Sequence, residues 1–404
     1  MRDRVLLLLC LLASPVAAQD TTVMLWTRLA LNSSKLNEPR SVLVATPEGY
    51  ATRTDRYPIL VILDADDKPQ FNLAVANVNF LASRGAIPRL IVVGIPNGKD
   101  RTHDLTPAAA GTRVKDFPTA GGAERFADFI VEEVVPLVRS KYRTLPSVLL
   151  AGHSFGGLLA LEAAAKRPGA FTGVIAMSPS LWWNDSTGIV SYSDAIAKGG
   201  KAQRLFVTSG GYEPDIDRTT QQFSQRLDSL KPALTAFGHR RYPDDNHGLT
   251  PAPSLADGLR FVFEPISTAK LPLASLGPSS DSATAMKALI ESRRRYAIGA
   301  RSFGLDERLP ESEMNQLGYG ILQVLKNPRF AVWVFQQNAD LYPESANVYD
   351  SLGDGLLAKG DTTAAMSQFR RAIDVATRTK HGVLEESKRK LKELEASRAA
   401  KPKN

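Results

Sequence analysis

The sequence has almost no cysteine and no concentration of one charge. Cys10 lies in an N-terminal segment that we expect to be removed, so the mature chain would have neither a disulfide nor a reactive thiolate. The formal net charge is +8 over 404 residues, without a long run of like charge, and this does not favour a nucleic-acid partner. The H-E-x-x-H, P-loop and Rossmann glycine patterns are also missing, so we expect no metal or other cofactor.

Long hydrophobic runs are scarce too. Val5 to Leu12 is a short apolar run, preceded by Arg2 and Arg4 and followed by small residues up to Ala18. This order is typical of a secretory signal at 1–18 that is cleaved after Ala18. The run is too short to span a bilayer as a mature helix, although an N-terminal membrane anchor is the alternative. We therefore expect an exported protein, either periplasmic or secreted.

Strand-like and helix-like segments alternate over residues 22–266. Short, continuous apolar runs are typical of buried strands in a parallel sheet, and they occur at 41–45, 57–63, 90–95, 147–151 and 205–208. Between them, apolar residues over 126–137 recur at helical spacing. The alternation predicts an α/β protein with the α/β-hydrolase arrangement, a mostly parallel sheet with helices on both faces.

The composition changes after residue 266. Residues 267–283 are rich in Ser, Pro and Ala and are interpreted as a linker, and helix formers dominate 284–379. Over 343–373 the large and small residues follow the spacing of a tetratricopeptide repeat, with a looser copy about 34 residues earlier. A generic helical hairpin is the alternative. Residues 380–404 are predicted to form a charged, solvated helical tail.

The segment Gly152-His-Ser-Phe-Gly156 has the pattern Gly-x-Ser-x-Gly, with Ser154 at its centre. A strand-like run precedes it and a helix-like run follows, which is the context that a nucleophile elbow requires. Glycines on both sides let neighbouring chain approach a strained turn, and the turn aims a helix N-terminus at the reacting centre. Ser154 is therefore the predicted nucleophile. The alternative is a glycine-rich turn with an idle serine.

A serine hydroxyl needs a neighbouring base to take its proton, and the chain offers five histidines. Position disfavours four of them, which lie before the elbow, within it, in a strand or in the helical region: His103, His153, His239 and His381. His247 lies in a turn-rich loop, late enough in the chain for the order Ser, acid, His. His247 is therefore the predicted general base.

The acid of a triad should follow a strand between Ser154 and His247. Residues 205–208 form such a strand, and a glycine turn leads from it to Glu213. A carboxylate there would hold the imidazole tautomer and stabilise its charged form. Glu213 is the predicted acid. Asp215 and Asp217 are alternatives, as is a serine–histidine pair without an acid.

An oxyanion hole needs two N–H donors. The residue after the nucleophile, Phe155, supplies one of them. The loop after the strand at 57–63 should supply the other, from Ala65 or Asp66. A backbone N–H has no side-chain signature, so this second placement depends on topology alone.

Together these motifs resemble the putative-esterase family of α/β-hydrolases, which includes esterase D, the secreted mycolyltransferases and the enterobactin-type siderophore esterases. The resemblance covers residues 22–266 and depends on five segments: Tyr57-Pro-Ile-Leu-Val-Ile-Leu-Asp64, Gly94 to Pro107, His247 followed by Asp257-Gly-Leu-Arg-Phe261, the elbow, and Ser178-Pro-Ser-Leu-Trp-Trp183. The chain departs from the family at Ala65, where glycine is usual. The elbow and the segment Ser178 to Trp183 are similar to the siderophore-esterase branch in particular.

The resemblance implies hydrolysis of carboxylic esters, in that branch sometimes of catecholate trilactones. Arg101, Trp182 and Trp183 are then candidates for binding an aromatic or anionic substrate. The alternatives are that Arg101 pairs with Asp104 within its own loop, and that the two tryptophans pack in the core or a lid.

Three functions are therefore open. The leading hypothesis is an exported serine hydrolase that cleaves a small-molecule ester through an acyl-enzyme. A second is an acyltransferase that uses the same residues, with an alcohol in place of water. A third is a protein that binds a partner through its repeats and has a vestigial esterase site. Self-association through the repeats is a separate alternative to a protein partner.

Overall fold

The computed structural model describes residues 24–399, except 52, 200–202, 232–233, 235 and 277–280. The predicted signal segment at 1–18 lies outside these residues. In the part of the chain that is described, no helix combines the length and the apolar character needed to cross a membrane.

Within the described residues, eight strands form one sheet in the order β1-β2-β4-β3-β5-β6-β7-β8. β3 to β8 run parallel, while β1, β2 and β4 pair antiparallel at one edge. The bounds are β1 Thr27–Ser33, β2 Glu38–Ala45, β3 Tyr57–Ile62, β4 Ile91–Gly94, β5 Thr144–His153, β6 Gly173–Met177, β7 Arg204–Gly210 and β8 Ala236–Tyr242. The five predicted strand runs lie in β2, β3, β4, β5 and β7, and the predicted mostly parallel sheet is confirmed.

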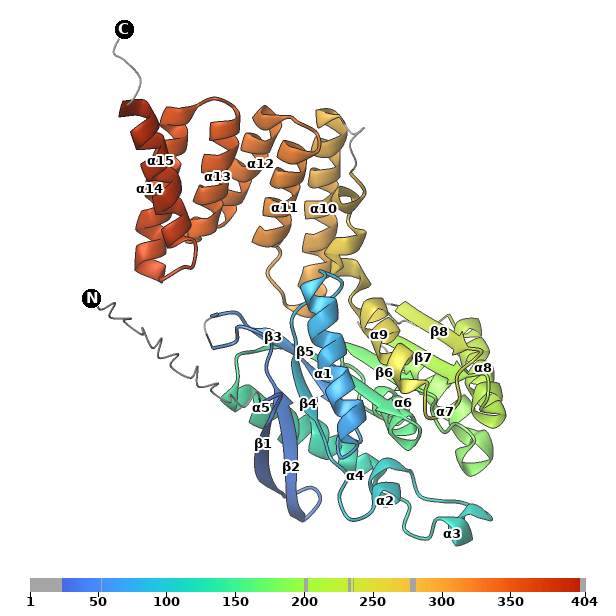
Figure 1. The fold of residues 1–404 in the computed structure, drawn as a ribbon. Coiled ribbons are helices and arrows are strands. Elements are labelled where there is room, and N and C mark those ends of the chain that lie inside the picture. The colour runs from blue at the N-terminus through green and yellow to red at the C-terminus, as the bar shows by residue number, and fades with distance from the viewer. Residues whose placement is uncertain are drawn as a thin grey trace, which may run out of the picture.

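Helices cover both faces of the sheet, as expected (Figure 1). One face packs against α1 (Lys68–Ser83) and α9 (Pro251–Val262). The other face packs against α4 Ala123–Asp128, the π-helix η1 Phe129–Val134, α5 Val135–Lys141, α6 Phe155–Lys166, α7 Trp183–Gly199 and α8 Pro214–Ser229. The short helices α2 (Arg101–Leu105) and α3 (Arg113–Asp116) lie in the connection between β4 and α4. Two apolar cores therefore sandwich the sheet.

A helical region follows the sheet, made of α10 Ser282–Phe303, α11 Glu311–Gln323, α12 Pro328–Leu341, α13 Ala346–Ala358, α14 Thr362–Thr379 and α15 Leu384–Ala399. Glycines allow neighbouring helices to pack closely here. A Cβ on Gly318 would lie 2.3 Å from the ring of Phe335, and one on Gly353 would lie 2.5 Å from the ring of Phe369. Paired helices of this kind suit the predicted repeats, and the tetratricopeptide assignment itself stays a prediction.

The helical region is joined to the sheet through α10, and the later helices extend away from the sheet (Figure 1). The rings of Phe263 and Phe303 lie 4.9 Å apart, and Ser147 Oγ donates to the Phe303 carbonyl at 2.7 Å. Buried apolar residues continue without a break from the α1 and α9 face into the helices. The two regions thus share one core.

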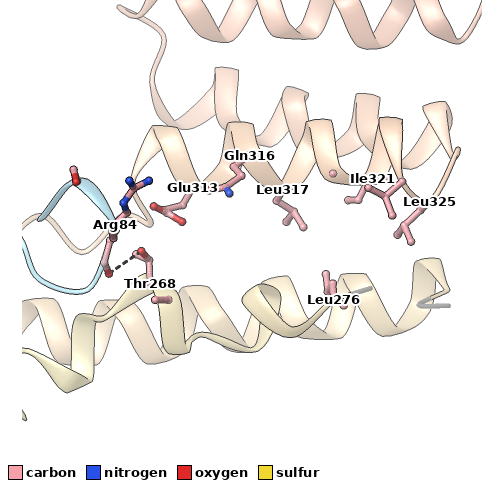
Figure 2. Close-up of a pocket in the computed structure, with 13 residues that line it drawn as sticks. Arg84, Thr268, Leu276, Glu313, Gln316, Leu317, Ile321 and Leu325 are labelled. Atoms are coloured by element: carbon pink, nitrogen blue, oxygen red, sulfur yellow. Dashed lines mark hydrogen bonds between the residues drawn. The ribbon is translucent and has the colours of Figure 1, made fainter. Parts of the chain in front are cut away.

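A crevice of about 670 Å³ lies beside this junction. In Figure 2, Leu317 and Ile321 of α11 and Leu325, just after this helix, lie on the side that faces Leu276, while Thr268 and Glu313 lie at the other end. Thr268 Oγ1 donates to the carbonyl of Gly85, in the loop after α1. The crevice therefore has an apolar part and a polar part.

The structure adds detail to the predicted linker and to the predicted tail. The described part of the predicted linker 267–283 forms the short 3-10 helices η3 (Thr268–Lys270) and η4 (Pro272–Ser275), and Leu271 between them is buried. The predicted solvated tail is helical, but α15 is bound on one side, because Lys390 Nζ pairs with Asp350 at 2.7 Å and with a second aspartate of α13. The tail is therefore held by two carboxylates of α13, of which Asp350 is buried, and the sequence of the tail alone does not reveal these partners.

Candidate active site

Ser154 stands on the turn between β5 and α6, with a left-handed φ of 61°. The turn is tight because a Cβ on Gly152 would lie 2.3 Å from the carbonyl oxygen of Gly156. The Ser154 N–H donates to Met177 O at the end of the neighbouring strand, at 3.0 Å. The local geometry is that of the predicted elbow, with the serine at the N-terminus of a helix.

His247 and Glu213 meet at the same edge of the sheet. His247 Nδ1 lies 2.5 Å from Glu213 Oε2, although 34 residues separate the two in the chain. Glu213 follows β7 and immediately precedes α8, while His247 lies in the loop between β8 and α9. The carboxyl ends of parallel strands gather at one edge, and this brings the two loops together.

Glu213 is buried and held as a carboxylate. Its Oε1 accepts from Ser178 Oγ at 2.5 Å and from the Gly210 N–H, and its Oε2 faces His247. Burial alone would raise the pKa of Glu213, but the hydrogen bonds from His247, Ser178 and Gly210 outweigh it and hold the pKa below its usual range. The group therefore stays ionised at neutral pH.

The two alternative acids have other partners. Asp217 is buried, accepts from Ser209 Oγ at 2.7 Å and pairs with Arg241 Nε at 2.8 Å. Asp215 is exposed and pairs with Arg218. Of the three carboxylates, Glu213 is the one that the structure brings to His247.

The contacts around the nucleophile are less direct than those around Glu213. Ser154 Oγ lies 3.4 Å from Ser180 Oγ, which is the contact that the structure records for this hydroxyl. The ring of His247 lies beside the elbow, with its centroid 4.3 Å from the ring of His153. Burial, reinforced by the nearby His247, lowers the pKa of His153 to about 3, so His153 is neutral. His239 lies within β8, as expected.

The two predicted oxyanion donors of the loop after β3, Ala65 and Asp66, differ in whether their N–H group already has a backbone partner. The Ala65 N–H donates to Ile95 O at 3.1 Å, so the structure contradicts Ala65 as a donor to substrate. The reason is that the loop pairs with the end of the next strand. Asp66 remains the candidate from this loop, and its carboxylate accepts from the Asn97 N–H at 3.0 Å. Phe155 begins α6, where backbone N–H groups have no partner within the helix.

Arg101 lies beside the elbow and pairs with Asp64 rather than with Asp104. Its Nε lies 2.6 Å from Asp64 Oδ1, and its guanidinium lies over the Phe155 ring at 5.5 Å. Asp104 instead pairs with Arg40, at 2.5 Å, so the alternative of an Arg101–Asp104 pair is wrong. Arg101 therefore braces the loop after β3 against the elbow.

The two tryptophans belong to an aromatic cluster with Phe117 and Phe155. Trp183 is only 3% exposed, which favours the packing interpretation for it. Trp182 is partly exposed, and the guanidinium of Arg113 lies 4.9 Å from its ring centroid. Trp182 also lines a groove of about 580 Å³ that reaches Glu213.

Sequence reasoning missed the hydroxyls that surround the triad residues. Ser178 Oγ contacts both Glu213 and Thr250, and Thr250 Oγ1 donates to His247 O at 3.1 Å. Ser178 and Ser180 belong to a segment that carried the family resemblance, but a serine motif does not say which group its hydroxyl will meet. In the described residues, no group of three or more His, Cys, Asp or Glu side chains could hold a metal ion.

Residues 33–236 match the family model described as "Putative esterase". The chain belongs to this family. It is 32% identical over 217 residues to the siderophore triacetylfusarinine C esterase of Aspergillus fumigatus, over 48% of this chain and 70% of that protein. It is also 32% identical over 145 residues to the ferri-bacillibactin esterase of Bacillus subtilis, over 32% of this chain and 49% of that protein.

Among solved structures, an IroE-like serine hydrolase from Shewanella oneidensis matches with a TM-score of 0.63 and 26% identity, over 78% of this chain and 99% of that chain. The fold is therefore that of an α/β-hydrolase, followed by a helical region. Family, relatives and fold agree that this esterase hydrolyses carboxylic esters with a serine-type site.

Proposed function

We propose that this esterase cleaves its substrate through an acyl-enzyme on Ser154, with His247 as general base and Glu213 as the acid. The observation that carries the proposal is the 2.5 Å contact between His247 Nδ1 and Glu213, beside a serine at φ 61° on an elbow. This arrangement supplies a nucleophile, a base and a group that orients the base.

The steps follow from these groups. His247 Nε2 takes the proton of Ser154 as Oγ attacks the ester carbonyl carbon, and Glu213 stabilises the resulting imidazolium. The N–H of Phe155 and that of Asp66 stabilise the oxyanion. The imidazolium then protonates the departing alcohol. Water then attacks the acyl-enzyme with the same proton transfers through His247. This step releases the carboxylic acid and restores Ser154.

We propose siderophore esters as the substrate class. Support comes from the two relatives, whose names describe siderophore esterases. The groove beside Glu213 also suits a large substrate with rings and polar groups, because it combines Trp182 and Ile216 with Arg113 and Arg218. Turnover of siderophore esters should therefore exceed that of simple aryl esters in kcat/KM, and equal rates on both would reject this substrate class.

Labelling with a fluorophosphonate tests the catalytic assignment. Ser154→Ala should lose the label and lower ester turnover by roughly four to six orders of magnitude, as triad knockouts do. His247→Gln should lose both label and turnover, whereas the matched change His239→Gln on β8 should keep both. Near-native turnover in Ser154→Ala would remove the serine from the mechanism. Product analysis with added alcohol separates hydrolysis from acyl transfer.

We also propose that the protein is exported. The support is the order of Arg2 and Arg4, the apolar run from Val5 and the small residues before Ala18. Expression of the full chain in a bacterium should yield a mature protein that begins at Gln19. N-terminal sequencing checks this, and an uncleaved chain in the cytoplasm would contradict it.

A further inference from the structure

The segment Ser178-Pro179-Ser180, which follows β6, lies between the acid and the nucleophile. Both of its serines are buried, Ser178 at 0% and Ser180 at 1% exposed. Ser178 Oγ lies 2.5 Å from Glu213 Oε1, and Ser180 Oγ lies 3.4 Å from Ser154 Oγ. One short segment therefore contacts both ends of the proposed triad.

The same segment also holds the backbone of the elbow. The Ser180 N–H donates to Ser154 O at 3.2 Å, and Met177 O, just before the segment, accepts from the Ser154 N–H at 3.0 Å. A φ of 61° is costly for a serine and persists only where its surroundings hold it. These two hydrogen bonds clamp the strained residue from both sides.

The close approach depends on α6 having no side chain at its third residue. A Cβ on Gly157 would lie 3.0 Å from Met177 O and 3.0 Å from Pro179 Cα. Ser178 itself has a φ of 44°, and its N–H donates to Thr208 O on β7 at 3.0 Å. Strained backbone in both Ser154 and Ser178 thus brings the segment against the elbow.

The hydroxyl of Ser178 sets the rotation of the Glu213 carboxyl group. Ser178 has one proton, and of its two neighbours the carboxylate is a stronger acceptor than the Thr250 hydroxyl at 2.9 Å. Glu213 Oε1 is then occupied by Ser178 and the Gly210 N–H. Oε2 is left to face His247 Nδ1.

We infer that Ser178 is a positioning residue for the proposed triad, and that Ser180 positions the nucleophile. Ser178 orients Glu213 and keeps it ionised, so that the imidazole of His247 stays in the tautomer that can accept the Ser154 proton. Ser178 itself transfers no proton. The inference depends on the proposed function, because it assigns the role through Glu213 and His247.

The pH profile of kcat/KM for a short activated ester, measured on the full chain, tests this role. Ser178→Ala should lower kcat by about 10- to 100-fold, since it removes a hydrogen bond to a charged group. It should also move the acid limb to higher pH. With one donor fewer, the pKa of Glu213 rises, and its carboxylate accepts more strongly from the His247 Nδ1–H.

Ser209→Ala is the matched control. Ser209 is a buried serine on β7 whose hydroxyl donates to a carboxylate at 2.7 Å, but that carboxylate is Asp217. The Ser209→Ala variant should lose stability as Ser178→Ala does, but its pH profile should keep the wild-type acid limb. Ser180→Ala should lower kcat without moving the acid limb, because Ser180 does not contact Glu213 in this structure.

Ser178→Gly covers the case in which the alanine variant folds poorly. Glycine accepts a φ of 44° readily, so this variant removes the hydroxyl and relieves the strain. It should show the same shift of the acid limb. Less than a twofold change in kcat with a wild-type acid limb would overturn the role of Ser178. If Ser154→Ala is itself active, the proposed function fails instead, and the two failures are thereby distinguished.

Discussion

Glu213 and Asp217 are buried carboxylates one helical turn apart, yet the fold gives them different tasks. Glu213 precedes the first turn of α8 and faces His247, whereas Asp217 lies inside α8 and pairs with Arg241. Hydrogen-bond partners hold the pKa of both groups low against the effect of burial. The two residues are alike in burial and charge, so their roles differ because their hydrogen-bond partners differ.

Exchanging each carboxylate for its amide separates the two roles. Glu213→Gln should lower kcat by roughly 10⁴-fold, because an amide can favour the wrong imidazole tautomer. Asp217→Asn should lower the melting temperature while changing kcat only a few-fold. Steady-state kinetics and thermal melts on both variants check this. A severe loss of kcat in Asp217→Asn alone would reverse the assignment.

The buried His153 should influence how the stability of the folded chain depends on pH. Its pKa is lowered to about 3 in the folded chain, against about 6.5 when unfolded, so the unfolded chain binds the extra proton between these values. The His153 contribution therefore makes folding less stable as pH falls from about 6.5 toward 3. His153→Gln should flatten the decline of the melting temperature over this window. An unchanged decline would show that His153 is not its source.

Two glycines in α11 show how packing decides whether a residue contributes to the stability of the chain. Gly318 and Gly320 lie two positions apart in this helix. A Cβ on Gly318 would lie 2.3 Å from the buried ring of Phe335, whereas a Cβ on Gly320 would meet nothing within 4 Å. The same residue type is thus required at one position and incidental at the other.

Alanine at each glycine should have opposite effects. Gly318→Ala should destabilise the chain by about 1–3 kcal/mol, because the Phe335 ring must shift in a packed core. Gly320→Ala should stabilise it by about 0.5–1 kcal/mol, since glycine is a poor helix former. Denaturant unfolding of both variants measures the difference. Equal effects of the two changes would contradict the packing of α11 on α12.

At the scale of the whole molecule, α10 serves the sheet region as much as the helical region. Phe303 packs on Phe263 and accepts a hydrogen bond from Ser147, and Gly299 lies close enough to Pro265 that a Cβ would be 2.5 Å from its carbonyl. These contacts place α10 against the core of the sheet region. The later helices extend away from the sheet (Figure 1).

Two shortened chains test this division. A chain that ends after Leu276 loses α10 and uncovers the apolar surface around Phe263, so it should melt lower and aggregate more readily. A chain that ends after Leu305 keeps α10 and should melt closer to the full chain. Melting curves and light scattering compare them. If both melted alike, α10 would not belong to the sheet's core. A dimer that becomes a monomer on shortening would indicate self-association through the repeats.

Local pattern in the sequence was enough to predict the alternating strands, the helical region that follows them and the tight turn at Ser154, and it proposed the order of serine, acid and histidine. These features depend on residues that are close in the chain, where steric rules and periodicity act directly. β1 was not predicted, because it is a half-exposed edge strand, and β6 was not predicted although its five residues are all buried.

Which groups meet across the fold depends on how the strands and loops pack together. Arg101 pairs with Asp64, 37 residues away, rather than with nearby Asp104, and the Ala65 N–H is taken by Ile95. Ser178 reaches Glu213 only because two strands end side by side. Such contacts depend on the packing of the whole sheet, and a residue type alone does not encode its partner when several polar groups of the same kind are available.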